Sequence, residues 1–205
     1  MIIGLLGFAG AGKSTVGDYL VQNHGYQKYA FADSLKDAVS VIFNWNRALL
    51  EGDTEPSRAF REKVDDFWSA RLGRRITPRM ILQKVGTDAM RNVIDQKIWV
   101  HSLESKITGK DNVVITDVRF PNEIDCIQRL GGKIIRIQRG PNPVWYDTAY
   151  KHNMLGIYEM YQKHPEVHVS EWAWIGVKPD ATIHNDGNKQ TLGTLVEKCL
   201  QVMPA

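Results

Sequence analysis

Residues 7–14 read GFAGAGKS and follow an apolar run from Ile2 to Leu6. The octet matches the pattern G-x-x-x-x-G-K-[S/T] at every fixed position. Its small residues let the backbone curl so that successive N–H groups point inward at phosphate oxygens. A helix that begins there adds partial positive charge. The sequence therefore predicts a loop that binds a nucleoside triphosphate between a strand and a helix; the alternative is a plain turn of small residues.

Within this loop, side chains and backbone groups have separate predicted roles. The Lys13 ammonium is expected to reach the β- and γ-phosphates of ATP, and the Ser14 hydroxyl to bind magnesium. The other expected ATP contacts come from the loop and the first helical turn: Gly10, Ala11, Gly12 and Thr15.

Length and composition limit the classes of protein to which the chain can belong. Its 205 residues, 43% hydrophobic and 24% charged, fit one globular domain with inserted segments. A net charge of +3 suits an anionic small molecule, but not stable nucleic-acid binding. Two cysteines suit neither a disulfide framework nor a paired metal site. With no signal-peptide pattern and no apolar run near about 18 residues, we expect a cytoplasmic protein without membrane contact.

Strand-like and helix-like segments alternate along the chain. This order predicts an α/β fold with a mostly parallel sheet, in a three-layer α/β/α phosphate-loop architecture. After the first strand we expect strands at 29–31, 113–116, 134–137 and 181–183, and helices at 14–23, 34–43 and 191–201. Segments 46–75 and 141–179 are too long for ordinary connections. Because both are rich in aromatic residues, we expect them to be ordered, as a substrate cover and a lid.

A helix start near residue 77 carries the first candidate acceptor residues. Thr77 is predicted to cap it and Pro78 to take its first position. Arg79 and Gln83 are four residues apart and share one face. An arginine fork can hold a phosphate and a glutamine amide can read a base edge, which suits a mononucleotide. The alternative for Arg79 and Gln83 is a solvent-exposed helix face without a ligand. Asp88 belongs either to the end of this helix or to a following loop.

Acidic residues follow two of the expected strands. Asp117 ends the run from Val113. An acid at this position is expected to hold magnesium through water or to orient Arg119. The alternative is a helix-capping role for Asp117, although Pro121 is expected to begin that helix and Asn122 to cap it. Asp33 follows the second strand, with Lys36 one turn later. Asp33 either contacts the acceptor sugar or caps the helix, with Lys36 in solvent.

Several of these motifs together resemble the deoxynucleoside monophosphate kinases of bacteriophages. The resemblance rests on Arg79-x-x-x-Gln83-x-x-Gly86-Thr87-Asp88 followed by Trp99, on Asp117-x-Arg119 with Glu123, on His168-x-Ser170-Glu171, and on Asn185-Asp186-Gly187. Scattered over 7–195, these motifs cover nearly the whole chain, and the phosphate loop is the least specific of them. Residues 46–75 match nothing in the family pattern.

The resemblance points to a homodimer and implies functional residues in each region. It assigns Asp117 and Arg119 to the active site, Thr87, Asp88 and Glu171 to the acceptor, and Asn185 and Gly187 to the donor base. A plain Asn-Asp-Gly turn is the alternative for the last two. Glu171 is expected to pair with an arginine rather than act as a base, since the acceptor phosphate, with a second pKa of about 6, is already anionic. Arg139, beside the lid, is the candidate that neutralises the transferring phosphoryl group, with a plain surface charge as its alternative.

The expected activity is transfer of the γ-phosphoryl group of ATP, with magnesium, to a deoxynucleoside monophosphate. The expected organisation is a single phosphate-loop kinase domain over 1–205, with an acceptor-binding region at about 46–100 and a lid at about 140–179. A kinase of dephospho-coenzyme A is the nearest alternative. A GTP-dependent switch would need an Asn-Lys-x-Asp, which the sequence lacks, and a nucleic-acid motor would need a second lobe and a basic groove.

Overall fold

The computed structural model describes residues 1–203, which divide into two compact units. Unit 1 combines Met1–Ala30 with Ile107 onward, and unit 2 is Phe31–Lys106. The expected acceptor region thus lies within unit 2 and the expected lid within unit 1. Over the described residues, no helix is both long enough and apolar enough to cross a membrane.

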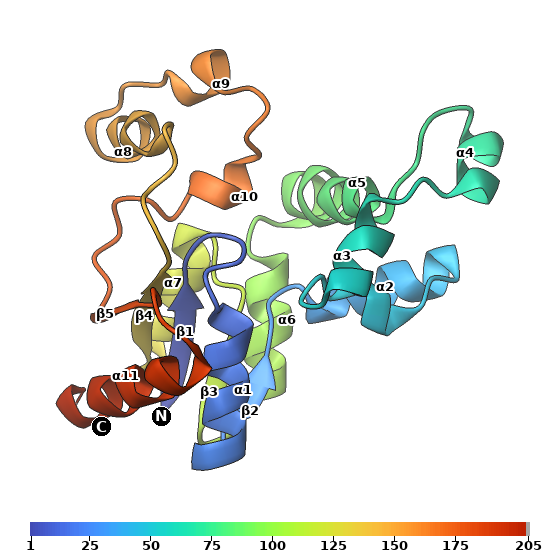
Figure 1. The fold of residues 1–205 in the computed structure, drawn as a ribbon. Helices are drawn as coiled ribbons and strands as arrows, with labels where there is room; N and C mark the ends of the chain where they lie inside the picture. Colours follow the sequence, from blue (N-terminus) through green and yellow to red (C-terminus); the bar gives the residue numbers. More distant parts are fainter. Residues whose placement is uncertain (204–205) are drawn as a thin grey trace. The chain divides into compact units, whose positions relative to one another are not determined.

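Unit 1 contains a five-stranded sheet in the order β2-β3-β1-β4-β5, and every neighbouring pair is parallel (Figure 1). Its strands are β1 (Ile2–Leu6), β2 (Gln27–Tyr29), β3 (Val113–Ile115), β4 (Lys133–Gln138) and β5 (Ala181–His184). The α/β fold class and the parallel sheet are confirmed. Because all five strands run the same way, the segments that follow them begin at one edge of the sheet, where open α/β sheets bind ligands.

The second strand lies earlier than predicted. Residues 29–31 look like a strand because they are apolar, but β2 ends at Tyr29, whose carbonyl accepts from the Thr116 N–H at 3.1 Å. Ala30 and Phe31 are buried beyond the end of this ladder. Their apolar character therefore reflects burial rather than strand pairing.

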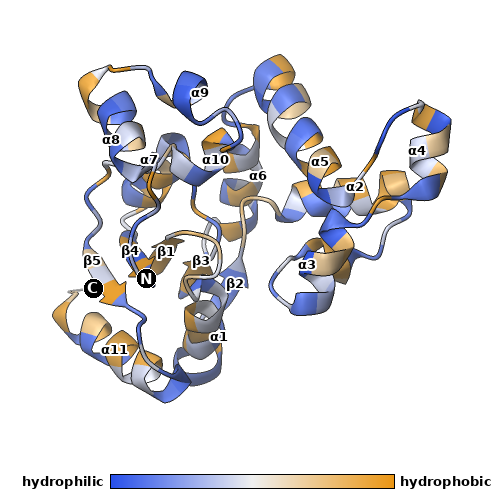
Figure 2. Cartoon of the chain, turned by 45° about the horizontal axis from the view of Figure 1, so that its top comes forward, coloured by the Kyte–Doolittle hydropathy of each residue, from blue (hydrophilic) through white to orange (hydrophobic). Residues whose placement is uncertain are grey.

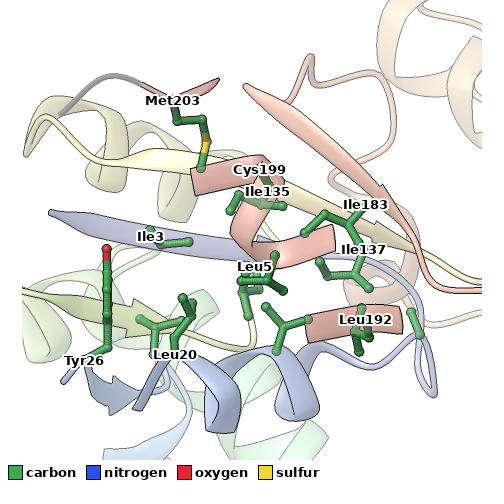
Figure 3. Packing of buried hydrophobic residues seen from close by; sticks show 14 residues of the cluster. Ile3, Leu5, Leu20, Tyr26, Ile135, Ile137, Ile183, Leu192, Cys199 and Met203 are labelled. Atoms are coloured by element: carbon green, nitrogen blue, oxygen red, sulfur yellow. The ribbon is translucent and has the colours of Figure 1, made fainter. Parts of the chain in front are cut away.

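In the described part of unit 1, the sheet is covered by α1 (Lys13–His24), α7 (Pro121–Arg129) and α11 (Lys189–Val202). On one face, strand residues pack against α1 and α11 through Ile3, Leu5, Leu20, Ile135, Ile137, Ile183, Leu192 and Cys199 (Figure 3). Figure 2 shows hydrophobic and hydrophilic residues interspersed along α11, as expected of a helix with one buried face.

The opposite face of the sheet packs against α7. Strand side chains alternate between the two faces, so Gly4 points away from the cluster that contains Ile3 and Leu5. A Cβ at Gly4 would lie 2.6 Å from the Ile127 side chain and 2.9 Å from that of Ile134. Glycine is therefore required there for α7 to lie against β1 and β4.

The segment expected to form a lid is ordered and has a small core of its own. It contains α8 (Tyr146–Leu155), α9 (Met160–Lys163) and α10 (Val169–Trp172). Met160 and Trp172 are buried in it. The Asn153 amide donates to the carbonyls of Trp172, at 2.9 Å, and Ile175, at 2.8 Å, which ties α8 to the end of the segment.

Unit 2 is helical, and residues 46–75 are ordered in it. Its elements are α2 (Asp33–Phe43), the 3-10 helix η1 (Arg47–Leu50), α3 (Glu55–Glu62), α4 (Asp66–Leu72), α5 (Pro78–Gln83), the π-helix η2 (Lys84–Ile94) and most of α6 (Ile98–Ile107). The Trp45 and Trp68 rings pack on Phe43, with centroids at 4.6 and 4.8 Å. The Trp45 indole donates to Asp65 at 2.7 Å.

The helix start at residue 77 is confirmed. The Thr77 side chain accepts from the Met80 N–H at 3.3 Å, and Pro78 takes the first helical position. The helix does not end near Asp88, because α5 continues directly into η2, which contains Thr87 and Asp88. A Cβ at Gly86 would lie 2.7 Å from Leu35, so the contact between η2 and α2 requires glycine there.

Candidate active site

The phosphate loop joins β1 to α1, as predicted. Gly7 has φ +141°, and a Cβ there would lie 2.2 Å from the Ile137 carbonyl oxygen. Gly12 has φ +104°, and its Cβ would lie 2.4 Å from the Asn185 amide nitrogen. Gly12 is also the N-cap of α1 and has no side chain to accept from the first helical N–H groups. These groups are therefore free of side-chain caps at the place where an anion binds most readily.

Lys13 lies over this loop. Its Nζ donates to the carbonyl oxygens of Gly7, at 2.7 Å, and Phe8, at 2.9 Å. Burial and the nearby Arg119 guanidinium lower the pKa of Lys13 to about 8, while Glu171 and Asp117 partly oppose them. The charges of Asp117, Arg119 and Glu171 therefore act on Lys13 in the phosphate loop.

Arg119 and Glu171 form an ion pair within this group. The Arg119 Nη1 lies 2.5 Å from a Glu171 oxygen and 3.4 Å from the Ser170 hydroxyl. Burial lowers the pKa of Arg119, but the carboxylates of Glu171, Asp117 and Glu123 outweigh it and leave that pKa raised. The prediction that Glu171 pairs with an arginine is confirmed. Glu171 lies in α10, whose N-cap His168 accepts from the Ser170 N–H at 3.3 Å.

Glu123 binds the backbone of Arg119 through its carboxylate. No role of its own was predicted for Glu123 from the sequence. Its carboxylate is buried, and one oxygen accepts from the N–H groups of Arg119, at 2.8 Å, and Phe120, at 3.2 Å. The prediction that Asn122 caps α7 is wrong: Pro121 takes the first position, so the N-cap is Phe120. A glutamate three residues after an N-cap is the recognisable signal for such a backbone clasp.

Asn185 contacts the loop from β5. Its amide is buried and donates to the Ala11 carbonyl at 2.8 Å. The next residue, Asp186, accepts from the Gly140 N–H at 3.1 Å, which joins the ends of β5 and β4. Gly187 follows at the surface. The structure thus brings Asn185 to the predicted ATP site through the loop backbone.

Arg139 follows β4 and is exposed. A different arginine, Arg136, contacts the lid segment. Its guanidinium lies over the rings of Tyr146, at 5.5 Å, and Trp174, at 5.3 Å, and it donates to Asn142 at 2.8 Å. Arg136 lies in β4 and flanks this segment in the sequence, as Arg139 does.

The acceptor candidates of unit 2 lie on α2, α5 and η2. Arg79 is paired with Glu62, and Lys84 lies 3.7 Å from Asp88. Gln83 and Thr87 are half-buried. The side chain of Gln83 follows Arg79 by one helical turn, as the spacing predicts.

Lys36 is not in solvent, and the alternative that placed it there is wrong. It is buried and lies 2.6 Å from a Glu51 oxygen and 3.6 Å from Asp33. Asp33 does not cap α2 through its side chain, because the N-cap is Ala32. The partner Glu51 could not be placed from the sequence, since it comes from a segment without a clear period.

A second cation joins this cluster. Arg47 lies 3.2 Å from Asp33 and 2.6 Å from Asp37, and it also pairs with Glu51. The Glu51 pKa is lowered, because Lys36 and Arg47 outweigh the effect of burial. Arg47 and Glu51 are therefore part of the surroundings of Asp33, although nothing in the sequence singled them out.

With the geometry in place, comparison with known proteins identifies the family. Residues 51–149 match the family model described as deoxynucleotide monophosphate kinase. A protein of Acanthamoeba polyphaga mimivirus with that name is 36% identical over 153 residues, covering 68% of this chain and 74% of the viral protein. The chain belongs to the deoxynucleotide monophosphate kinase family. The kinase of Enterobacteria phage T4 is 22% identical, covering 98% of this chain and 99% of its own.

Solved structures of other small-molecule kinases also resemble this family member. The shikimate kinase of Aquifex aeolicus has a TM-score of 0.44 and 15% identity, covering 98% of this chain and 96% of its own. The dephospho-CoA kinase of Campylobacter jejuni has a TM-score of 0.40 and 14% identity, covering 98% and 95%.

Proposed function

We propose that the chain transfers the γ-phosphoryl group of ATP to a deoxynucleoside 5′-monophosphate and so supplies diphosphates for DNA synthesis. The observation that carries this proposal is the phosphate loop, where the start of α1 has no side-chain cap and the Lys13 ammonium donates to the loop carbonyls. The charge of Arg119, which follows β3, acts on Lys13. Two cations that act together suit a reaction with phosphate groups on both sides of the transferred phosphorus. The names of the mimivirus and phage relatives support the acceptor class.

On the donor side, the amides of Gly10, Ala11, Gly12, Ser14 and Thr15 and the Lys13 ammonium hold the triphosphate. The Asn185 amide donates to the Ala11 carbonyl and so stabilises the loop conformation that binds ATP. The loop that contains Gly187 then lies toward the base of ATP. In this role Asn185 acts through the backbone of the loop rather than on the nucleotide itself.

Magnesium fits the oxygen donors at this site. Asp117 follows β3 and raises the Lys13 pKa, so its charge acts on Lys13. Ser14 is the second residue of α1, next to Lys13. A hydroxyl, one carboxylate and substrate phosphates form a donor set that magnesium prefers. When bound, the ion would neutralise charge on the phosphate oxygens.

On the acceptor side, we assign Arg79 to the phosphate and Gln83 to the base, with Thr87, Asp88, Asp33 and Lys36 around them. Glu62 holds Arg79 in the structure, and a phosphate dianion would compete for the same guanidinium. In unit 1, Arg119 is held by Glu171, and we assign its guanidinium to the acceptor phosphate as well.

In the reaction, an oxygen of the acceptor phosphate attacks the γ-phosphorus in line. The bond from that phosphorus to the bridging oxygen breaks, and ADP leaves. The attacking oxygen is already deprotonated near neutral pH, so the protein contributes positioning and charge rather than a base. Arg139 and the 140–179 segment, as a lid, would limit the access of water. The viral origin of the relatives supports work in the host cytoplasm.

The test is a coupled ADP-release assay with ATP, magnesium and each common ribo- and deoxynucleoside monophosphate, with dephospho-coenzyme A as the control acceptor. We expect turnover with one or more deoxynucleotides, and loss of turnover in a folded Lys13→Ala variant. Activity on the control acceptor alone would overturn the acceptor assignment. Undiminished turnover in folded Lys13→Ala would overturn the donor assignment.

A further inference from the structure

Phe8, in the phosphate loop, has a side chain that phosphate binding does not require. The loop binds phosphate through backbone N–H groups, and the neighbouring variable positions Ala9 and Ala11 are small. The Phe8 ring instead packs against Trp174, with ring centroids 5.0 Å apart, and against Trp145 at 5.5 Å and Tyr146 at 6.3 Å. An aromatic residue therefore connects the loop to the 141–179 segment.

These contacts close the base of that segment. Trp145 and Tyr146 lie at its start and Trp174 near its end, so one ring holds both. Trp174 is 3% exposed, and Arg136 of β4 packs on Tyr146 and Trp174 as well. Aromatic pairs of this geometry contribute beyond the area that they bury.

The backbone of Phe8 forms a hydrogen bond with Lys13. Its carbonyl oxygen accepts from the Lys13 Nζ at 2.9 Å, and the Gly7 carbonyl is the other acceptor. Donor phosphates that draw the ammonium toward themselves would remove this bond. Phe8 therefore provides both the carbonyl that donor phosphates would release and the ring that packs against the 141–179 segment.

The other end of the connection reaches Arg119. Glu171, the partner of Arg119, stands three residues before Trp174. Within residues 171–174, Glu171 thus pairs with Arg119 and Trp174 packs against Phe8. A shift at Phe8 would move both ends together, since the stretch between them includes the buried Trp172.

We propose that Phe8 is a positioning residue that couples occupancy of the phosphate loop to the placement of the 141–179 segment and, through Glu171, of Arg119. The proposal rests on the proposed function for the identity of the donor. In this proposal the Phe8 side chain transmits donor binding to the 141–179 segment, while the backbone of the loop binds the phosphates.

The test is amide hydrogen exchange with and without magnesium and ADP, with ADP affinity measured by calorimetry on the same samples. In the natural sequence, we expect ADP to slow exchange over residues 165–176 by about fivefold or more, the lower end of usual site–site couplings. Phe8→Leu should keep ADP affinity within about threefold, because the loop amides remain, and should lose this slowing. Phe8→Tyr should restore it.

Tyr150→Leu is the matched control, because Tyr150 is a partly exposed aromatic residue of α8 outside the Phe8 cluster. It should behave like the natural sequence. If Phe8→Leu is unstable, Trp174→Leu removes the same contact from the other side and should give the same loss. ADP binding with unchanged slowing in these variants would overturn the coupling alone. Failure of the natural sequence to bind ADP would overturn the proposed function and the coupling together.

Discussion

At the scale of single residues, Lys13 combines a required positive charge with a lowered pKa. Because this pKa is about 8 rather than 10.5, the ammonium loses its proton at moderately alkaline pH. We expect kcat/KM for ATP to fall as pH rises through about 8, since this ratio reports the ionisation of the free enzyme. Bound phosphates favour the charged form, so kcat should fall at higher pH than kcat/KM.

A pH profile of kcat and kcat/KM checks this expectation. Lys13→Arg is the control, since an arginine stays protonated throughout the range and its residual activity should show no fall near pH 8. A profile that stays flat up to about pH 10 in the natural sequence would contradict a lowered Lys13 pKa.

The neighbours of Lys13 provide a second prediction, with opposite signs. Arg119 lowers the Lys13 pKa and Glu171 raises it. Glu171→Gln should therefore shift the pH dependence of ADP binding to lower pH, and Arg119→Gln should shift it to higher pH. Calorimetric titrations across the pH range measure both without relying on turnover. Shifts in the same direction for both variants would show that these charges do not act on Lys13.

At the scale of elements, the start of α7 depends on Glu123. Glu123→Ala would leave the N–H groups of Arg119 and Phe120 without this acceptor, which we expect to cost about 1–3 kcal/mol of unfolding free energy. Glu123→Gln keeps an oxygen that can accept and should cost less. Urea unfolding of the three proteins gives the comparison. Equal stability of Glu123→Ala and the natural sequence would mean that the clasp contributes nothing.

Elements defined by local pattern could be predicted from the sequence, and those defined by distant partners could not. Thr77 and Pro78 act within a few residues, and they lie where the sequence places them. The phosphate-loop glycines also lie where their motif predicts, although the contacts that require Gly7 and Gly12 come from distant Ile137 and Asn185. By contrast, β2 was misplaced because buried Ala30 and Phe31 look like strand residues. The continuation of α5 into a π-helix also has no local signal.

The same limit applies to the site. The pairing of Glu171 with an arginine was predictable from residue type and family resemblance, although the partners are 52 residues apart. The surroundings of Lys36 were not, because Glu51 and Arg47 come from a segment without periodicity, and only folding brings them to Asp33. Charge alone does not tell a buried lysine from a solvated one.

At the scale of the whole molecule, the chain passes from unit 1 into unit 2 after Ala30 and returns at Ile107. The donor candidates lie in unit 1, and most acceptor candidates lie in unit 2. If these assignments are correct, the two substrates should stabilise different parts of the chain when each is bound alone. A ligand at about 100 times its Kd stabilises the state that binds it by about 2.7 kcal/mol, which is ample for detection by amide exchange.

Amide exchange of the natural sequence with one ligand at a time makes this a direct measurement. With magnesium and ADP, we expect slower exchange in the phosphate loop and the start of α1, within residues 7–16. With a deoxynucleoside monophosphate alone, we expect slower exchange over residues 77–91, which include Arg79, Gln83, Thr87 and Asp88. In Arg79→Ala the second effect should disappear while the first remains, because Arg79 lies outside unit 1. Slowing confined to unit 1 with either ligand would place both substrates there and remove the acceptor role of α5 and η2.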